Sequence, residues 1–160
     1  MNDVYLSNEA ATQAFGECIA VAIAAPMIIS LQGDLGTGKT CLVRAILRKL
    51  GITGSIKSPS FTLIESYDTK GFTVYHCDLY RMSDPMELEY LGLRDYAATD
   101  AIIFVEWPEH GEGYLPPPDI AIKLTEKNNG RILTLCGESQ QGRRVIKGIN
   151  DDWSSTLAAD

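Results

Sequence analysis

Eight consecutive residues have the types and spacing of a phosphate-binding loop. Residues 33–40 read Gly-Asp-Leu-Gly-Thr-Gly-Lys-Thr and match the P-loop pattern G-x-x-x-x-G-K-S/T. The glycines let the backbone turn tightly and bring its N–H groups close to an anion. Lys39 would reach the outer phosphates of a nucleotide, and the Thr40 hydroxyl would hold Mg²⁺. We therefore expect nucleotide binding here instead of a simple glycine turn before an amphipathic helix.

The flanking segments have the order that a P-loop requires. Residues 27–31 form an apolar run that predicts a buried strand, and residues 41–50 place leucine, valine and isoleucine at helical spacing. A helix that begins at Gly38-Lys39 adds its N-terminal dipole to the loop amides. The residues predicted to contact the nucleotide are Gly33, Asp34, Leu35, Gly36, Thr37, Gly38, Lys39, Thr40 and Cys41.

Two acidic residues follow predicted strands and are candidates for handling the metal and water. Glu106 ends the most apolar run after the P-loop strand, where P-loop proteins place the acid of the metal site. Asp78 ends a half-polar strand. We assign Mg²⁺ to Thr40 and Glu106, and metal-bound or attacking water to Asp78, which makes Lys39, Asp78 and Glu106 the predicted catalytic set. The alternative for each acid is simple solvation or a helix cap.

Hydroxyl residues lie where nucleotide hydrolases carry a switch loop. Ser58, Ser60 and Thr62 stand between the P-loop helix and the next strand, in the position of a loop that senses the γ-phosphate and Mg²⁺. A Ser-Pro turn before a strand is the competing interpretation. The guanine-reading motif Asn-Lys-x-Asp is absent, which favours ATP.

Trp107 and the pair Arg143-Arg144 each allow two interpretations. Trp107 directly follows Glu106, and from the residues alone a place at the edge of the core is favoured over stacking on a base. Arg143-Arg144 would suit the lid of a kinase, but surface charge is the favoured interpretation.

Composition limits the possible functions. The 160 residues are 45% hydrophobic, enough for one domain with a core. A net charge of −7 argues against a bare nucleic-acid-binding surface. Apolar runs are too short for a membrane span and the start lacks a basic signal region, so we expect no membrane and a cytoplasmic location. The four cysteines include no C-x-x-C pair and are expected to be reduced thiols, and two separated histidines do not suggest zinc.

The remaining chain predicts further helices and hairpins. A helix should run from the cap residue Ser7 to about residue 24 and end before Pro26. Hairpins are expected over residues 62–79 and 119–136, the second with an Asn-Gly turn at residues 129–130. A helix capped by Asp84 should continue through Tyr90.

We expect a folded domain followed by a less ordered tail. Residues 1–139 form the predicted P-loop domain. Residues 140–160 are polar, and because Trp153 is their only large apolar anchor we predict a loosely ordered tail.

Several motifs taken together resemble one family. The set comprises residues 33–40, Ser58-Pro59-Ser60-Phe61-Thr62-Leu63, His76-x-Asp78-Leu79-Tyr80-Arg81, Glu87-Leu88-Glu89, Leu91-Gly92-Leu93 and Glu106-Trp107-Pro108-Glu109. In this order and spacing they resemble the TsaE family of small bacterial ATPases of tRNA threonylcarbamoyladenosine synthesis, over roughly residues 4–137.

The resemblance implies an α/β P-loop NTPase-type domain of three layers with a mixed parallel and antiparallel sheet. It implies Mg²⁺ on Thr40 and Glu106, a requirement for Asp78 in hydrolysis, and Trp107 near the nucleotide. It also implies TsaB and TsaD as partners, with TsaD transferring the threonylcarbamoyl group to tRNA. ATP hydrolysis would drive turnover of that complex, and tRNA would be an indirect partner through the complex, with direct contact to this chain left open.

One position departs from the family pattern, and two other functions remain as alternatives. The family usually has Ser-Pro-Thr where this chain has Ser60 in the third place, so the hydroxyl is kept and a methyl group is lost. The alternatives are a small-molecule P-loop kinase and a nucleotide-dependent scaffold that does not hydrolyse ATP.

Overall fold

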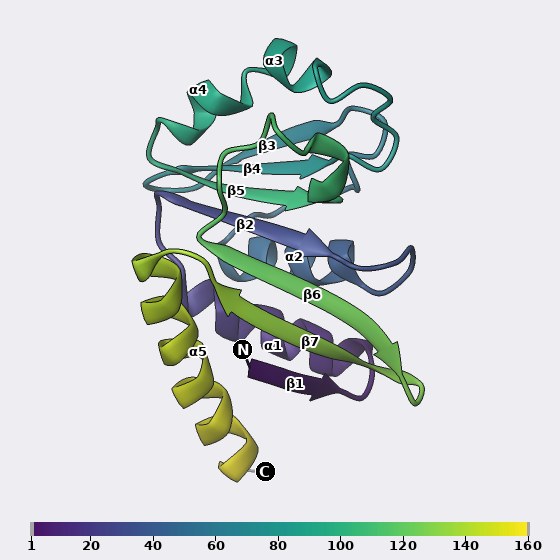
Figure 1. Cartoon of the computed structure of the whole chain (residues 1–160). Coiled ribbons are helices and arrows are strands. Elements are labelled where there is room, and N and C mark those ends of the chain that lie inside the picture. The colour runs from purple at the N-terminus through teal and green to yellow at the C-terminus, as the bar shows by residue number, and fades with distance from the viewer. Residues whose placement is uncertain (1, 160) are drawn as a thin grey trace.

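A seven-stranded sheet forms the centre of the protein (Figure 1). The structure, a computed structural model, describes residues 2–159, with side chains from residue 3 to residue 155. The strands are β1 (Asn2–Leu6), β2 (Met27–Gln32), β3 (Ile64–Asp68), β4 (Thr73–Asp78), β5 (Ala101–Glu106), β6 (Ile120–Lys127) and β7 (Gly130–Gly137). The helices are α1 (Glu9–Ala22), α2 (Lys39–Lys49), α3 (Glu87–Leu91), α4 (Leu93–Ala97) and α5 (Gln140–Ala159), with a 3₁₀ turn η1 (Pro108–Gly111).

Strand direction changes from the centre of the sheet to its edges. The order is β1-β7-β6-β2-β5-β4-β3, in which the four central strands β6, β2, β5 and β4 are parallel. The edge pairs β1–β7, β7–β6 and β4–β3 are antiparallel. Every residue of β5 is buried, as expected for a parallel strand covered on both faces. The mixed sheet confirms the predicted α/β architecture.

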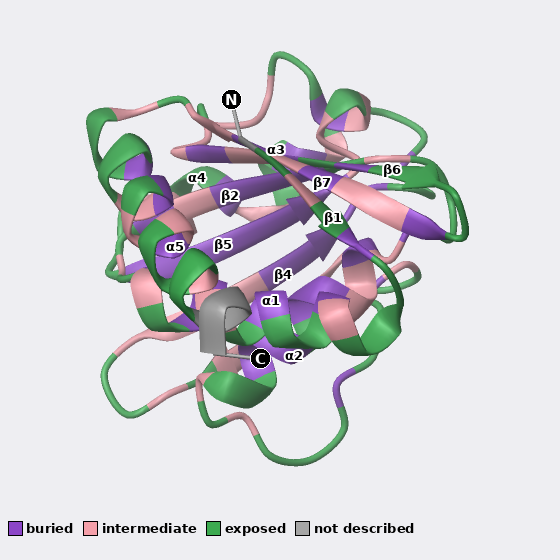
Figure 2. Cartoon of the chain, turned by 90° about the horizontal axis from the view of Figure 1, so that it is seen from below, coloured by how far each residue is buried: buried purple, intermediate pink, exposed green. Residues whose placement is uncertain are grey.

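Helices lie on both faces of the sheet and give three layers. On one face, α1, α2 and α5 pack on a large apolar cluster that contains Phe15, Ile46 and Phe104. On the other, α3 and α4 cover only the β4–β5 part through a smaller cluster around Leu88, Leu93 and Ile103. Figure 2 shows the buried residues concentrated on the central strands and on the helix surfaces that meet them.

Strand alternation decides which side chains can face the P-loop. Side chains two apart in a strand share a face. Phe104 belongs to the cluster under α1 and α2, so Glu106 projects on that face, and Val74 gives His76 and Asp78 the same direction. The P-loop joins β2 to α2 on this face, at the carboxyl ends of the parallel strands, where open α/β sheets bind their ligands.

The predicted loose tail is instead the longest helix of the described residues. α5 packs against β7 and α1, and Ile146 and Ile149 are buried in the large cluster. The edge of the Trp153 ring meets Phe15, with ring centroids 4.9 Å apart. These three positions lie three and four residues apart on one helical face. Gly142 and a second glycine lower the helix propensity and hid this pattern.

Residues 140–159 therefore pack on the same sheet as the rest of the chain and are not a separate loose segment. Met1 and Asp160, at the outer ends of the two predicted ranges, lie outside the described residues. No helix within residues 2–159 is both long enough and apolar enough to cross a bilayer.

Three smaller predictions also need correction. α1 is capped by Asn8 rather than Ser7, because Asn8 Oδ1 accepts from the Ala11 amide at 2.9 Å. The β6–β7 turn is centred on Asn128 and Asn129, both left-handed, and not on an Asn-Gly pair. The third predicted helix begins at Glu87, because the residues from Asp84 form a hydrogen-bonded turn before it.

Candidate nucleotide-binding site

A cavity of about 350 Å³ opens where the P-loop meets the carboxyl ends of β4 and β5. We call it the P-loop cavity. Its lining comes from the P-loop, the segment before β3, and the ends of β4 and β5. The lining residues are Leu35, Gly36, Gly38, Lys39, Thr40, Cys41, Ser58, Ser60, Asp78, Tyr80, Arg81, Glu106 and Trp107. Most of the predicted site residues therefore meet here, although they lie far apart in the sequence.

The P-loop has the backbone that its glycines permit. Gly36 and Gly38 have φ values of 83° and 102°, and Gly38 is the residue that precedes α2. Lys39 Nζ donates to the carbonyl oxygens of Gly33 at 2.6 Å and Asp34 at 2.8 Å, so the ammonium group lies inside the loop. Burial lowers the pKa of Lys39, and nearby carboxylates, with Glu106 the strongest, oppose that shift.

Three predicted contact residues support the loop instead of lining the cavity. Thr37 is buried, and its hydroxyl donates to the Asp34 carbonyl at 2.9 Å. A side chain at Gly33 would collide with the Leu124 carbonyl of β6, which explains why glycine is needed there. Gly33, Asp34 and Thr37 are thus absent from the lining, and the carbonyl oxygens of Gly33 and Asp34 accept hydrogen bonds from within the loop.

Thr40 and Glu106 form the predicted metal pair. Thr40 Oγ1 lies 3.0 Å and 3.1 Å from the two carboxylate oxygens of Glu106. A hydroxyl and a carboxylate are the hard oxygen donors that Mg²⁺ prefers, and Mg²⁺ commonly takes one or two protein oxygens beside substrate phosphates and water. Among the described residues no group of three or more His, Cys, Asp or Glu side chains could form a cage for a metal. The donor set thus fits Mg²⁺ held together with a nucleotide.

Asp78 lies directly beside Glu106. The two residues are register partners at the ends of the parallel strands β4 and β5. Asp78 Oδ1 accepts from the Tyr80 amide at 3.0 Å, and Oδ2 accepts from the Ser58 hydroxyl at 3.1 Å. The carboxylate is therefore fixed at one oxygen by its own strand end and at the other by the predicted switch loop.

His76 also belongs to the site, although from the sequence we assigned it no role. Its side chain is 0% exposed, and Nε2 lies 2.7 Å from Glu106 Oε1. With a carboxylate as its partner, Nε2 carries the proton and donates. Nδ1 has no hydrogen-bond partner among the residues that the structure describes. The available signal was its alternation with Asp78, which puts both side chains on one face of β4.

Trp107 both packs and lines the P-loop cavity. Its ring lies under the Lys39 ammonium, 4.2 Å from Nζ to the ring centroid, which is a cation–π contact. The residue is half-buried against the smaller apolar cluster and has a left-handed backbone with φ of 57°. The interpretation of Trp107 as a core-edge residue alone is therefore incomplete.

The predicted switch loop is only partly at the cavity. Ser58 and Ser60 line it, but Thr62 does not, because its hydroxyl donates to Glu65 Oε1 at 3.0 Å on the surface. Phe61, between Ser60 and Thr62 in the sequence, is 80% exposed, and its ring centroid lies 4.3 Å from the guanidinium of Arg81.

Two arginines outside our predicted site residues, Arg81 and Arg131, contact the site, whereas Arg143 and Arg144, for which surface charge was favoured over a kinase lid, do not line it. Arg81 lines the cavity. Arg131 of β7 donates to the Thr37 carbonyl at 3.2 Å and packs against Gly38, a contact between distant strands that has no local sequence signal. Arg143 donates to backbone carbonyls of residues 137 and 138 near the start of α5, which favours the structural interpretation of that pair.

The geometry agrees with the comparisons to known proteins. Residues 6–133 match the family model of threonylcarbamoyl adenosine biosynthesis protein TsaE. The chain belongs to the TsaE family. Membership gives it a role in the biosynthesis of threonylcarbamoyladenosine in tRNA.

Relatives from distant bacteria cover most of the chain. The TsaE protein of Haemophilus influenzae is 42% identical over 125 residues, which are 78% of this chain and 79% of that protein. The TsaE protein of Synechocystis is 42% identical over 111 residues, 67% of this chain and 70% of that protein. The crystal structure of Bacillus subtilis YdiB superposes with a TM-score of 0.80 at 27% identity, covering 94% of this chain and 95% of that one. The fold is thus the P-loop NTPase type.

Proposed function

We propose that this chain binds ATP with Mg²⁺ and hydrolyses it slowly, and that hydrolysis drives turnover of a TsaB–TsaD complex that makes threonylcarbamoyladenosine in tRNA. The observation that carries the proposal is the meeting of Asp78 and Glu106 as register partners opposite Lys39 and Thr40 of the P-loop. A phosphate loop alone supports binding, whereas two adjacent acids beside it support hydrolysis.

The P-loop residues and Glu106 have separate tasks in this proposal. The loop amides and Lys39 hold the β- and γ-phosphates. Thr40 and Glu106 hold Mg²⁺, which supplies charge neutralisation on the phosphate oxygens when it is bound. Because Thr40 and Glu106 are already in contact, little rearrangement is needed to present both oxygens to one ion.

Asp78 is proposed to orient the attacking water. Its carboxylate lies beside the metal acid and is held by Ser58 and by the Tyr80 amide, so its direction is set before substrate arrives. A fixed acceptor of this kind lowers the barrier by placing the nucleophile in line with the phosphorus.

The link between Ser58 and Asp78 also suggests how hydrolysis is reported to partners. Loss of the γ-phosphate changes the charge next to Asp78, and Ser58 connects that carboxylate to the loop that carries Phe61. The loop is exposed, so a change in its position reaches the protein surface.

Phosphate release is the direct test. We expect the purified chain with Mg²⁺ and ATP to release phosphate slowly, and the addition of TsaB and TsaD to accelerate release. Asp78→Asn should suppress release in both settings, whereas Asp100→Asn, an exposed aspartate outside the cavity, should leave it unchanged.

Two results would contradict the proposal. Release that depends on an added small metabolite would indicate a kinase. No release under either condition, together with ATP-dependent binding to TsaB and TsaD, would indicate a scaffold that does not hydrolyse ATP.

A further inference from the structure

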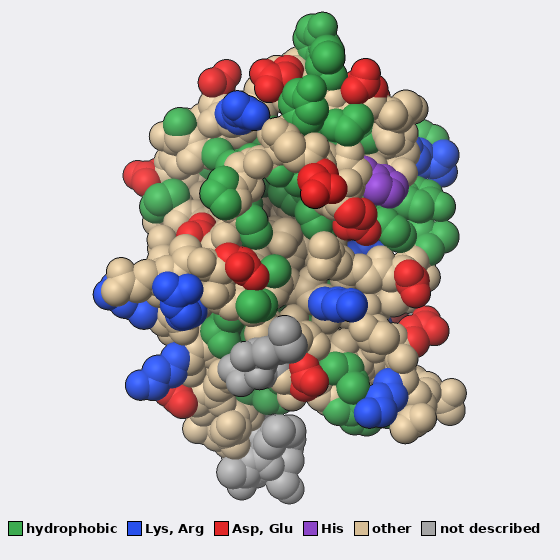
Figure 3. All heavy atoms as spheres, viewed as in Figure 1, with side chains coloured by type: hydrophobic (Ala, Val, Ile, Leu, Met, Phe, Trp, Pro, Cys, Tyr) green, Lys and Arg blue, Asp and Glu red, His purple; other side chains and the backbone are tan. Residues whose placement is uncertain are grey.

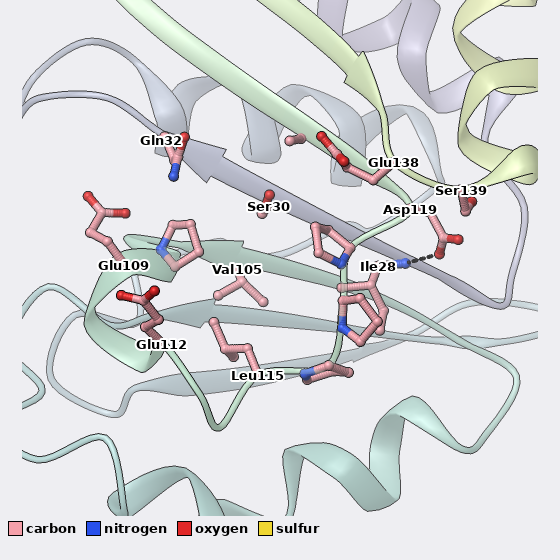
Figure 4. A pocket seen from close by; sticks show the side chains of 15 residues that line it. Ile28, Ser30, Gln32, Val105, Glu109, Glu112, Leu115, Asp119, Glu138 and Ser139 are labelled. Carbon is pink, nitrogen blue, oxygen red and sulfur yellow. Dashed lines mark hydrogen bonds between the residues drawn. The ribbon is translucent and has the colours of Figure 1, made fainter.

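A second and larger cavity lies on the opposite face of the sheet. It measures about 810 Å³, and Ile28 and Ser30 of β2 lie along its floor (Figure 4). Ala121 of β6 also lines it. We call it the β2–β6 groove. Residues 115–118, a leucine and three prolines, form one wall. None of these residues belongs to the P-loop cavity.

The groove exists because the helices on this face cover only part of the sheet. α3 and α4 pack over β4 and β5, whereas on this face of β2 and β6 the 3₁₀ turn η1 contributes only the residues at one end of the groove. The apolar residues of β2 and β6 that alternate with the floor, such as Ile29 and Ile122, face the large cluster. The side chains on the open face are correspondingly smaller or polar.

Ser30 is an unpartnered polar group on the floor. It lies in the middle of a central strand, is 7% exposed, and forms no side-chain hydrogen bond in the part of the chain that the structure describes. Figure 4 shows its hydroxyl directed into the groove. The hydroxyl is not among the fully buried polar atoms that lack a partner, so it is open to the groove, where an occupant can accept or donate a hydrogen bond in place of water.

Carboxylates stand at both ends of the groove. Glu109 and Glu112 lie at one end and Glu138 near the other, with the apolar floor between them (Figure 4). All three are exposed, and no ion pair involves any of them among residues 3–155. The lining contains no Lys, Arg or His. Beyond the lining, Lys123 follows Ala121 by two residues, Lys39 is close enough to Glu109 to interact with its charge, and Arg143 donates to the Glu138 carbonyl at 3.4 Å. Figure 3 shows acidic side chains beside the hollow on this face.

The walls are held in place before any ligand arrives. The prolines have restricted backbones. The Asp119 carboxylate accepts from the Ile28 amide at 2.9 Å, and the Asp119 carbonyl accepts from the Glu138 amide at 2.8 Å. These bonds tie the wall to β2 and to the end of β7, so an occupant meets a preformed surface and loses less entropy on binding.

We propose that the β2–β6 groove binds an extended protein segment with basic residues at both ends of a short apolar centre. The basic ends match the separated carboxylates, and the apolar centre covers the floor and the proline wall. A backbone or side-chain polar group of the segment completes the hydrogen bond of Ser30. The proposal does not depend on the proposed ATPase function.

Size favours a polypeptide over a linear polyamine. Pockets that enclose drug-sized ligands measure about 300–1,000 Å³, and this groove lies in the upper part of that range. A thin polyamine would satisfy the carboxylates but leave much of the apolar floor uncovered. A peptide with side chains fills both parts.

The test measures binding of a defined peptide to the full chain. The probe is a fluorescent, amidated heptapeptide with two lysines at each end of a Leu-Ala-Leu centre. We expect saturable binding in the micromolar range that weakens with added salt. Glu112→Lys/Glu138→Lys should weaken it at least about tenfold. Ser30→Ala, which removes only the hydroxyl, should weaken it about threefold or more.

Matched controls separate the groove from general charge effects. Glu126→Lys/Asp151→Lys makes the same charge change at exposed positions outside the groove and should leave binding within about twofold of wild type. A peptide with glutamates in place of the lysines should not bind.

Three outcomes would overturn the proposal. They are no saturable binding at millimolar peptide, equal loss in the groove and control double variants, and spermidine binding at least as tightly as the peptide. The last outcome would assign the groove to a small polycation. Circular dichroism of each variant confirms that the fold is retained.

Discussion

The two cavities differ in how their polar groups are satisfied. In the P-loop cavity the central polar groups contact one another, as Thr40 does with Glu106 and Ser58 with Asp78. In the β2–β6 groove, the Ser30 side chain has no hydrogen-bond partner within the described chain, and no ion pair among the described residues involves the rim carboxylates. The first arrangement fixes reacting groups in position, and the second offers unsatisfied groups to a ligand.

The largest expected effect separates the two cavities completely. Lys39→Ala removes the ammonium group that would meet the outer phosphates, and we expect ATP affinity to fall by about 100-fold or more. Binding of the basic peptide to the groove should not change. Titration of both ligands by fluorescence checks this, and retained ATP affinity would contradict the assignment of the P-loop.

Substitutions of Asp78 and Glu106 should produce different kinetic defects. Asp78→Asn keeps the shape but weakens the acceptor for water, so we expect kcat to fall about 100-fold with ATP affinity nearly unchanged. Glu106→Gln removes the charge that would face the proposed Mg²⁺ ion, so the Mg²⁺ concentration for half-maximal rate should rise about tenfold or more. Initial rates over a Mg²⁺ series distinguish them, and identical defects would show that the roles are not separate.

A smaller effect is expected when His76, the hydrogen-bond donor to Glu106, is replaced. His76 Nε2 donates to Glu106 Oε1, and this bond orients the carboxylate toward Thr40. His76→Leu should lower Mg²⁺ affinity about tenfold, and His76→Gln, which can still donate, should recover part of that loss. ATP affinity without metal should be unaffected by either variant. If the two variants lower Mg²⁺ affinity equally, the bond has no orienting role.

The cysteines should show the smallest effect. Burial, with a contribution from the Asp78 charge, raises the pKa of the Cys77 thiol to about 12. Its thiolate is therefore scarce at pH 8, and iodoacetamide should not label it in the native protein. Burial also raises the pKa of Cys41, but this residue lines the P-loop cavity and should label slowly, with protection by ATP.

Peptide mass spectrometry after labelling checks both cysteines.

The raised pKa of Cys77 also has a thermodynamic consequence. Because the folded state keeps the proton to higher pH than the unfolded state, this group's contribution to stability is complete below about pH 9 and is lost as pH rises toward 12. Rapid labelling of Cys77 at pH 8 would show that β4 opens.

The parts of the site that could be predicted are those encoded locally. Glycine spacing at residues 33–40 specified a loop that needs left-handed backbone and close approach to an anion. Glu106 and Asp78 were recognisable because each ends a strand, and the carboxyl ends of parallel strands meet at one edge.

The parts that could not be predicted depend on pairing between distant segments. Arg131 reaches the P-loop only because β7 lies two strands from β2 in the sheet. Ser30 became informative only when the structure showed that it lines a cavity on the face of β2 away from the large cluster. The α5 helix was missed because tertiary packing on Phe15 and β7 outweighs the low helix propensity of its glycines.

The central claim is that ATP hydrolysis at Asp78 and Glu106 resets a tRNA-modifying complex. The most direct measurement counts modified tRNA per TsaB–TsaD complex when this chain is supplied with ATP, with a non-hydrolysable ATP analogue, or as Asp78→Asn. We expect many rounds with ATP and about one round in the other two cases. Many rounds with the analogue or with Asp78→Asn would contradict the account.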